Sequence, residues 1–532
     1  MARVFELTTP LGKDVLLFRA LRGREELSRL FEYDLLALST DAAIAPGKLL
    51  GRDVSVSVEL ANGERRHIHG YVTRFAAGAM VGRYYEYRMR VQPWLWFLTR
   101  TADCRIFQDK TPIEIIKDVF ADHKDVAVYE ESLTGTYAKR EYCVQYRETD
   151  FAFVSRLMEE EGMYYHFEHQ ADQHVLKIVD ASAAHVAIPG RPTIAFYPPG
   201  RQVRVDPEYI HHWVPTEELQ PGEAVTDDYD FTRPKVELEV KARLAQPHER
   251  ARYEVYDWPG EYYEMADGEH YIKTRIDEFH TQFDRAEAEC NVRDVVVGHL
   301  FTLTNAPRED QAREYLIVSA RWDMRDNAYE TTSEEAVTFF CGFNALQSKQ
   351  QFRPARLTPR PTVKGTQTAM VVGPDGEEIY CDKYGRIKVL FHWDRYGKGD
   401  ENSSCWIRVS QNLSGKRWGM VFIPRIGQEV IVDFLEGDPD RPIVIGAVYN
   451  GLEMPPYPLA EHKTKTVIFK SNSSLGGNGF NEMRIEDKKG EEQVFVHGEK
   501  DLDVRIKNDR REWIGNDRHL VVKRDKVEEV TR

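Results

Sequence analysis

The side chains in this sequence that could bind a metal ion begin with a histidine pair. His67 and His69 flank Ile68 in a run that alternates polar and apolar residues, so both imidazoles would lie on one face of a strand. Two imidazoles can start a zinc site, but no Cys, Asp or third His stands at ligand spacing. The pattern favours two solvent-facing histidines over a metal site, and we expect no cofactor.

A glycine-rich run could in principle hold a phosphate group. Residues 474–479 read SLGGNG. A phosphate loop would end in Gly-Lys followed by Ser or Thr and would open a helix, and this run does neither. A flexible linker is the better interpretation.

Three consecutive carboxylates, Glu159, Glu160 and Glu161, resemble the cluster that acid–base catalysis needs. Consecutive residues on a helix point in different directions, so a solvated helix end is the better interpretation. Neither a GxSxG nor an HExxH motif occurs in the sequence. We therefore expect that the chain is not an enzyme.

Residues 1 to about 360 predict a mainly β region. Short runs at 54–58, 68–72 and 84–91 alternate between polar and apolar residues, as half-buried strands do. Such a region is typical of barrels or sandwiches with a few inserted helices.

Three helices are expected within this region. The first begins at Thr111 as N-cap, with Glu114 completing a capping box. The second runs from about 149 to 161 and ends at Gly162. A third, weaker helix is expected over 284–290.

A second, smaller β unit follows. Its candidate strands lie at 385–391, 404–410, 418–423, 427–435 and 441–449. Val430, Val432 and Phe434, and again Ile443 and Ile445, alternate toward one interior, which is typical of an OB-type barrel.

The charges of this unit and its flanks decide how it is interpreted. From Asp382 to Asn450 there are ten Lys or Arg against nine Asp or Glu, with no basic stripe that could follow a phosphate backbone. A structural role is therefore favoured over nucleic-acid binding. Residues 345–370 and 451–482 are rich in proline or glycine and are expected to be linkers, the first of them alternatively an extended strand.

The last forty residues carry an eight-residue repeat. Aspartates recur at Asp501, Asp509, Asp517 and Asp525, and an aliphatic residue stands five positions after each. Because eight is even, these aliphatics share one face of an extended chain. The expected core positions are Val494, Val496, Leu502, Val504, Ile506, Ile514, Leu520, Val522 and Val530. One or two aliphatics per repeat cannot bury enough surface alone, so we expect several chains to intertwine, with threefold symmetry favoured over a lone β-helix or a disordered tail.

Composition limits the remaining possibilities. A length of 532 residues predicts three or four domains, and a net charge of −15 argues against non-specific binding to nucleic acid or anionic membranes. The six cysteines form no CxxC pair and are expected to be reduced and buried. No signal peptide or membrane span is recognised, so we expect synthesis in the cytoplasm and secretion by a route that reads no N-terminal signal.

Several runs resemble one known family, the VgrG spike proteins of type VI secretion. They are 104–120, 141–165, 385–395, 403–411, 418–419, 423–450 (IPRIGQEVIVDFLEGDPDRPIVIGAVYN) and 469–493. In the barrel the resemblance rests on Gly385, Trp393, Trp406, Arg408, Trp418, Pro424, Arg425, Gly427, Glu429, Val430, Phe434, Gly437, Asp438, Pro439, Pro442 and Gly446. It covers nearly the whole chain.

The resemblance implies a homotrimer with four parts in each chain. They are a hub of two similar β-barrels at 1–365, an OB-fold neck at 370–450, a linker at 451–482 and a triple-stranded β-helical needle at 483–532. Such spikes sit on a tube of Hcp rings, carry a PAAR-type tip, effectors or adaptors, and contact baseplate and sheath components. Sheath contraction drives them through a target membrane, in which they do not reside.

Three alternatives remain open. A contractile-phage hub and spike with a cell-wall hydrolase would need an enzyme domain, and residues 451–482 leave room only for a tether. A carbohydrate- or nucleic-acid-binding OB protein with a β-helical stalk is the second. The third is a spike with a toxic extension beyond Arg532.

Overall fold

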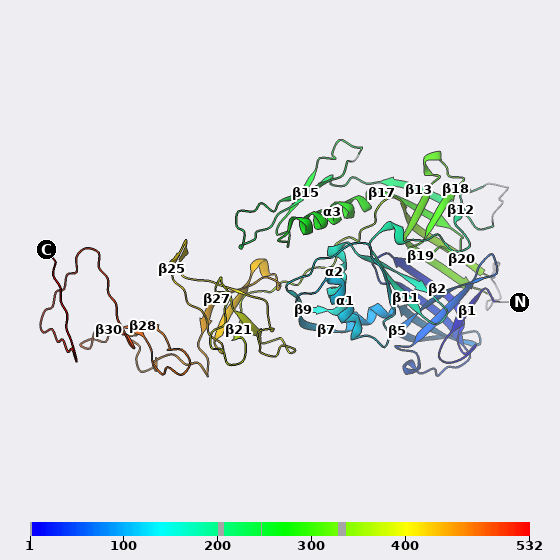
Figure 1. The fold of residues 1–532 in the computed structure, drawn as a ribbon. Helices are drawn as coiled ribbons and strands as arrows, with labels where there is room; N and C mark the ends of the chain where they lie inside the picture. The colour runs from blue at the N-terminus through cyan, green and yellow to red at the C-terminus, as the bar shows by residue number, and fades with distance from the viewer. Residues whose placement is uncertain (1–2, 201–206, 246, 328–336, 532) are drawn as a thin grey trace.

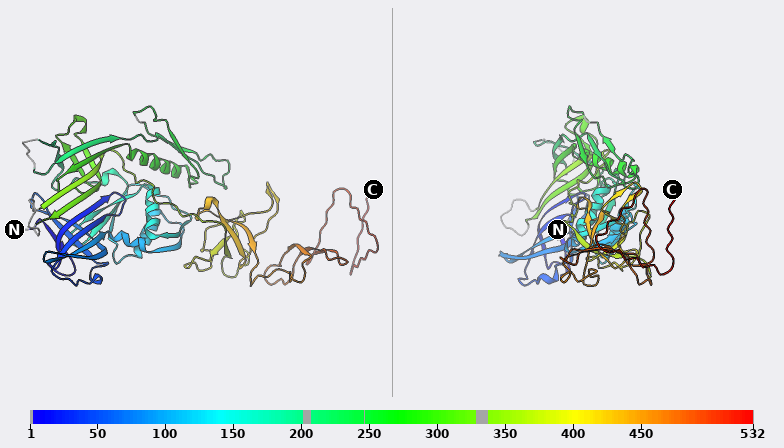
Figure 2. Two further views of the ribbon diagram at one scale, coloured as in Figure 1. Left: turned by 180° about the vertical axis from the view of Figure 1, so that it is seen from behind. Right: turned by 90° about the vertical axis from the view of Figure 1, so that its left-hand side faces the viewer.

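The computed structural model describes residues 3–200, 207–245, 247–327 and 337–531. The chain is drawn out along one direction (Figure 1). A large β body with the N-terminus lies at one end, a small barrel follows, and the C-terminal segment forms the other end (Figure 2). The expectation of a mainly β fold with a few helices is confirmed.

The large body is built on one twelve-stranded sheet. Its main path runs β1-β4-β5-β6-β3-β2-β19-β20-β17-β13, and β18 pairs with both β12 and β19. The strands are β1 (Phe5–Thr8), β2 (Leu17–Glu26), β3 (Glu32–Ser39), β4 (Asp53–Glu59), β5 (Arg65–Val81), β6 (Tyr84–Gln92), β12 (Thr193–Ala195), β13 (Ile210–Glu217), β17 (Asp284–Cys290), β18 (Leu300–Thr304), β19 (Glu314–Asp326) and β20 (Val337–Gln347). The antiparallel pairing of β2 with β19 joins two strongly curved halves, seen in blue and green in Figure 1.

Alternating sequences form these strands because one face of each is buried. In β4 the side chains of Val54, Val56 and Val58 enter the core, while β1 and β5 pair with its two edges. The core formed in this way extends continuously through both halves of the sheet. The large sheet is therefore one packed unit.

The first two expected helices are present. In α1 (Pro112–Ala121) the Glu114 amide donates to Oγ1 of Thr111 and the Glu114 carboxylate accepts from the Thr111 amide, so the capping box is confirmed. Helix α2 (Asp150–Glu161) ends at Gly162, whose φ of 73° is the left-handed conformation that glycine adopts without strain. Within the described ranges, none of the helices is long and apolar enough to cross a membrane. Short 3-10 helices are η1 (Pro46–Lys48), η2 (Trp94–Arg100), η3 (Ser182–Ala184), η4 (Glu309–Gln311) and η5 (Leu435–Gly437).

The third expected helix is wrong. Residues 284–290 form β17, in which Ala286, Ala288 and Cys290 are buried at a period of two. The helix of this region is α3 (Met265–Thr281), which lies earlier in the chain. It packs on a three-stranded sheet of β14 (Glu223–Thr226), β15 (Val240–Arg243) and β16 (Glu254–Asp257), and together they form an arm that extends from the large sheet (Figure 1).

Two further small sheets complete the large body. They are the pair β7 (Ala102–Phe107) and β9 (Cys143–Thr149), and the sheet of β8 (Tyr129–Ser132), β10 (Tyr164–His169) and β11 (His174–Val179). Helix α2 connects β9 to β10. It lies on the side of the large body that is next to the small barrel (Figure 1).

The small barrel is a five-stranded sheet in the order β22-β21-β26-β27-β23. Its strands are β21 (Gln367–Val372), β22 (Lys388–Phe391), β23 (Arg408–Val409), β26 (Glu429–Phe434) and β27 (Pro442–Val448). The expected strand at 418–423 is not among them, because its first residues form only β25 (Trp418–Gly419), paired with β24 (Ser414–Gly415) outside this sheet. The fifth strand is β21 instead, which begins before residue 370, where the OB-fold neck was expected to start.

The interior of the barrel is partly as expected. Val430, Val432 and Phe434 are buried in its core, as the alternation predicts. In β27 the parity is reversed: Val444 is buried and Ile445 is 45% exposed. The cause is an irregularity in the β26–β27 register between Ile431 and Val432, which shifts the pairing by one residue.

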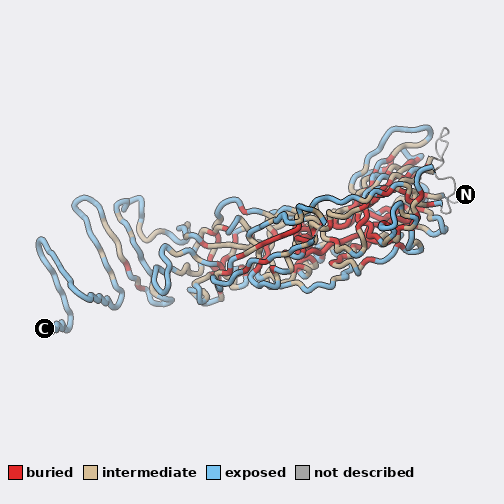
Figure 3. Tube along the Cα trace, turned by 90° about the horizontal axis from the view of Figure 1, so that it is seen from above, coloured by how far each residue is buried: buried red, intermediate tan, exposed pale blue. Residues whose placement is uncertain are grey.

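The C-terminal part is almost entirely exposed in a single chain (Figure 3). A three-stranded sheet joins β28 (Lys465–Lys470), β29 (Glu482–Glu486) and β30 (Gln493–His497). Strand β28 lies inside the range expected to be a linker. From 498 to 531 the chain runs in extended stretches joined by bends and has no strand pairing of its own.

Candidate functional site

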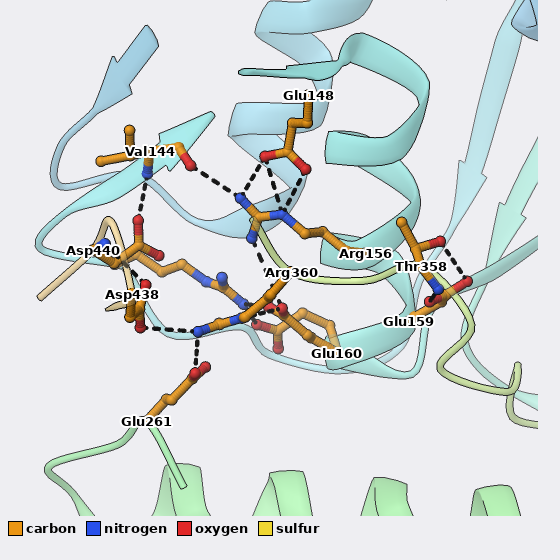
Figure 4. Close-up of polar contacts among 12 residues, drawn as sticks. Val144, Glu148, Arg156, Glu159, Glu160, Glu261, Thr358, Arg360, Asp438 and Asp440 are labelled. Atoms are coloured by element: carbon orange, nitrogen blue, oxygen red, sulfur yellow. Dashed lines mark hydrogen bonds and ion pairs between the residues drawn. The ribbon is translucent and has the colours of Figure 1, made fainter. Parts of the chain in front are cut away.

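The three consecutive carboxylates that end α2 are not solvated. Glu159 and Glu161 are only 3% and 2% exposed, and Glu160 is half-buried. Successive residues of a helix point about 100° apart, yet Glu160 and Glu161 both accept from Arg140, at 2.9 and 2.8 Å, while Glu159 meets other partners. Glu159, for example, accepts hydrogen bonds from the amide and hydroxyl of Thr358 at 2.9 and 3.0 Å (Figure 4). The expectation of a solvated helix end is wrong, because these partners come from distant parts of the sequence.

Arg360 joins three parts of the fold. It lies between β20 and β21, and its Nε donates to Glu160 Oε1 at 2.9 Å. Its Nη1 donates to Asp438 Oδ2 at 3.1 Å and also contacts the carboxylate of Glu261 (Figure 4). One guanidinium therefore ties α2 of the large body to the loop before α3 and to the turn between β26 and β27 of the barrel.

Arg156 holds a second contact to the barrel in place. Its buried guanidinium makes paired hydrogen bonds to Glu148 at 2.9–3.2 Å and donates to the carbonyl of Val144 at 3.0 Å. The amide of Val144 in turn donates to Asp440 Oδ1 at 2.6 Å (Figure 4). Strand β9 is thus fixed between an arginine of α2 and an aspartate of the barrel turn.

Two more hydrogen bonds support this boundary. Arg441 donates across it to Asp228 of the arm at 2.5 Å, and within the barrel the amide of Val363 donates to the carbonyl of Gly437 at 2.8 Å. Gly437 has φ of 73°, and a Cβ there would lie 2.6 Å from the Thr362 side chain, so the turn requires glycine. We call the network the joint. Its members are Arg140, Val144, Glu148, Arg156, Glu160, Glu261, Arg360, Asp438 and Asp440.

The joint holds more carboxylates than guanidinium groups, and this imbalance shifts their pKa values. Although burial favours its protonated form, Arg360 and Arg140 lower the pKa of Glu160 far below its ordinary value. Burial and then the neighbouring carboxylates raise the pKa of Glu261 to about 7 and that of Asp440 to about 6. The Glu261 side chain is still 31% exposed, so water moderates its shift.

The side chains of the joint hold the large body and the barrel together. Its carboxylates are engaged by guanidinium groups and backbone amides, and a buried ion pair that loses one partner leaves an uncompensated charge. A cleft of about 900 Å³ opens beside it, between the arm and the barrel. Sequence reasoning missed the joint because its arginines and aspartates are scattered. The one local signal was three glutamates at the end of a helix.

The histidine pair lies on β5, where His67 is half-buried and His69 is buried. His69 is 2% exposed and lies 2.9 Å, Nδ1 to Nδ1, from His174 of β11, whose Nε2 accepts from the Trp94 amide at 2.9 Å. The expectation of two solvent-facing histidines is therefore wrong for His69, because the β10–β11 hairpin covers it. Across the described ranges, no group of three or more His, Cys, Asp or Glu side chains is arranged to hold a metal ion.

The expected core residues of the C-terminal repeat are all exposed in the single chain. Their exposed fractions range from 45% to 83%. Trp513 and Val521, which stand at the opposite parity, are 99% and 87% exposed. The repeat thus has no interior within one chain, yet the two faces already differ.

The barrel residues on which the resemblance rests occupy three settings. Val430 and Phe434 lie in the core, and Trp393 packs against it. The turns are formed by Gly385, Gly427 and Gly437, which have positive φ, and by Asp438 and Pro439, and Pro442 begins β27. Of the remainder, Arg408 and Trp418 are exposed, and the others are half-buried: Trp406, Pro424, Arg425, Glu429 and Gly446.

Three family models match the chain. They are the phage tail baseplate hub over residues 24–328, the type VI secretion system/phage-baseplate injector OB domain over 377–449, and the bacteriophage T4 gp5 C-terminal trimerisation domain over 467–532. The hub model alone covers more than half of the chain.

Two solved structures share the fold. The E. coli c3393 protein, a type VI secretion component similar to T4 tail proteins gp27 and gp5, aligns with a TM-score of 0.60 at 20% identity, over 83% of this chain and 100% of that one. VgrG in the Francisella PdpA–VgrG complex, half-lidded, aligns with a TM-score of 0.57 at 9% identity, over 93% of this chain and 86% of that one.

Two proteins found by sequence comparison have higher identity to this chain than these structures have. The actin cross-linking toxin VgrG1 of Vibrio cholerae is 33% identical over 98% of this chain, which covers 48% of that protein. The type VI secretion system spike protein VgrG1c of Pseudomonas aeruginosa is 48% identical over 97% of this chain, which covers 71% of that protein. This chain therefore belongs to the VgrG family of type VI secretion system spike proteins.

Proposed function

We propose that three copies of the chain form a spike whose needle core is shared between them. The proposed core residues are Val494, Val496, Leu502, Val504, Ile506, Ile514, Leu520, Val522 and Val530. The observation that carries the proposal is their exposure in a single chain within a segment that matches a trimerisation domain. Each such side chain contributes about 1.5–3 kcal/mol when it is buried, which a lone ribbon cannot obtain.

The proposed role is mechanical. Pushed from behind by an Hcp tube, with a PAAR-type tip ahead and baseplate and sheath components around it, the spike would cross a target membrane and carry effectors or adaptors. A thrust along the needle reaches the hub only through the barrel, and the joint fastens that boundary at Arg360 and Asp440. The relative in the Francisella complex is bound to PdpA, which supports a carrier role.

We propose the same four-part division that the sequence suggests, with two borders moved. The neck would begin with β21 at Gln367, and the needle assembly with β28 at Lys465. The chain would assemble in the cytoplasm and be secreted by the system without a signal peptide.

We further propose that the residues of this chain perform no catalysis. The clustered carboxylates of α2 are committed to arginines and backbone donors, which leaves no acid–base pair among them. The Vibrio relative is named a toxin, but this chain covers only 48% of it, so that name is not carried over.

A solution mass measurement tests the trimer. Light scattering of the purified chain should give three times 61.7 kDa, and imaging should show a threefold body with a thin rod. A stable monomer with an ordered C-terminal segment would overturn the proposal.

A further inference from the structure

A short hairpin leaves the barrel between β23 and β26. We call residues 411–423 the tongue. Its strands β24 and β25 pair only with each other, and β25 stands clear of the barrel in Figure 1. Gln411 closes its base, since its side chain accepts from the Phe422 amide at 2.9 Å and donates to the Phe422 carbonyl at 3.2 Å. Hydrogen bonds therefore give the tongue a defined conformation.

The tongue presents apolar side chains to solvent. Those exposed by 43–73% are Leu413, Trp418, Met420, Val421 and Phe422. A two-stranded hairpin is marginally stable by itself, and contiguous apolar surface of this kind marks an interaction site. The barrel core is already complete without these side chains.

Further exposed apolar side chains follow along the chain toward the needle. In β27, Ile445 and Val448 are exposed, the first because of the register irregularity, and the exposed Tyr449 follows the strand directly. Leu452 and Met454 are exposed after them, and so are Ile468 and Phe469 in the segment that matches the trimerisation domain. Because the exposed apolar residues run along the chain into a trimer-forming segment, the partner they fit is a second copy of this chain.

Threefold symmetry determines which part of the second copy the tongue contacts. The C-terminal segment continues outward from the barrel along the long direction of the molecule (Figure 3). A threefold axis through the needle would therefore follow this direction. Rotation about this axis keeps each segment level with its counterpart, so the tongue meets a neighbouring barrel and not a neighbouring hub. Such a head-to-tail contact closes into a ring of three.

Charge complements this contact. The tip of the tongue carries Lys416 and Arg417, and the surface at the end of β27 carries Glu453, whose carbonyl accepts from the Asn450 amide at 3.1 Å. We propose that the tongue of each copy packs on the exposed apolar side chains at the end of β27 in the next copy, Trp418 and Val421 against Ile445, Val448 and Tyr449, with its basic tip at Glu453. The proposal rests on the trimer proposed above.

A photo-crosslinker tests the contact in the full chain. With p-benzoylphenylalanine in place of Trp418, irradiation should join two chains, and the joined peptides should pair the tongue of one with 442–454 of the other. The same group in place of Met80, which is 56% exposed on β5 of the large body, is the control and should not reach 442–454. Crosslinks within one chain only, or to the hub, would overturn the proposal, and so would the absence of any crosslink from position 418 in a preparation of trimer mass.

A charge reversal provides a second test that does not alter the apolar surface. Lys416→Glu with Arg417→Glu should reduce the crosslink yield roughly three- to tenfold, and adding Glu453→Lys should restore it. No reduction, or a reduction without restoration, would count against the contact. Light scattering of each variant separates the two proposals, because a monomeric wild-type chain contradicts the spike, whereas a trimer without the crosslink contradicts only the tongue.

Discussion

Arg360 donates from Nε to Oε1 of Glu160 at 2.9 Å, although the two residues lie 200 positions apart in the chain. The same guanidinium reaches Asp438 in the barrel turn, so the last turn of a hub helix and the base of the neck share one cation. In an extended spike this is where hub and neck could separate. A buried network with partners on both sides makes that separation costly.

Removing the shared cation should therefore loosen the joint. Arg360→Met leaves Glu160, Asp438 and Glu261 without their common partner, and we expect a loss of about 3–5 kcal/mol of stability. Differential scanning calorimetry should show a lower Tm for the unit that contains the joint. Arg22→Met is the matched control, because its pair with Asp323 is on the surface, with the Arg22 side chain 67% exposed. Equal shifts for both variants would contradict the role of the joint.

The raised pKa of Asp440 predicts a pH dependence at the joint. Its pKa is about 6 in the folded chain against an ordinary 3.8, so between these two pH values the folded state holds a proton that the unfolded state has released. The cost of ionising it is complete above about pH 6 and absent below about pH 4. Asp440→Asn removes this cost while it keeps an acceptor for Val144. Its Tm should exceed that of the wild type near pH 8, and the difference should vanish near pH 4.

The exposed Asp375 gives the control for that measurement. Asp375→Asn should follow the wild-type curve at every pH. A gain for Asp440→Asn that is the same at both ends of the range would mean that the effect does not come from titration of this carboxyl.

The covered histidines predict the opposite dependence in the hub. Burial, and next the neighbouring imidazoles, lower the pKa of His174 well below its ordinary 6.5. Because the folded pKa is depressed, the unfolded chain binds more protons below about pH 6.5, and stability is lost as the pH falls. His174→Gln keeps an acceptor for the Trp94 amide but does not titrate. It should cost about 1–3 kcal/mol at neutral pH. The decrease in Tm between pH 7 and pH 5 should become smaller, and an unchanged slope would contradict this assignment.

Local patterns predicted the elements that depend on local contacts. The capping box of Thr111 and Glu114 lies within one helical turn, and α1 begins there. Helix α3 was missed because its N-cap, Glu264, makes no side-chain capping bond and Gly268 lies inside it. The expected helix at 284–290 failed because its apolar residues, the small Ala286, Ala288 and Cys290, gave the alternation of a strand little weight.

The joint could not be predicted in the same way. From sequence alone, Glu159, Glu160 and Glu161 indicate a solvated helix end, because most of the groups that neutralise them stand far away in the sequence. Thr358 and Arg360 stand about two hundred positions later, and only the fold brings them together. The reversed parity of β27 has the same origin, since the irregularity that causes it belongs to the pairing of two strands and not to either one.

The parity of the needle repeat supplies the sharpest prediction. Replacing Ile506, Ile514 and Val522 with Asp places three carboxylates per chain where the other copies are proposed to supply the interior. Each lost side chain removes about 1.5–3 kcal/mol, and each buried charge adds a further penalty. We expect the trimer to dissociate or its needle to fray, which light scattering and limited proteolysis of the C-terminal segment measure.

The repeat provides its own control one residue away. Trp513 and Val521 are 99% and 87% exposed, against 45% for both Ile514 and Val522. Trp513→Asp with Val521→Asp adds carboxylates to the same stretch of chain on the opposite face, so the mass should remain that of a trimer. If both sets of substitutions have the same effect, charge alone is responsible and the shared interior is contradicted. If only the inward set dissociates the spike, the ribbon obtains its core from the neighbouring chains, because an extended strand separates its two faces at every second residue.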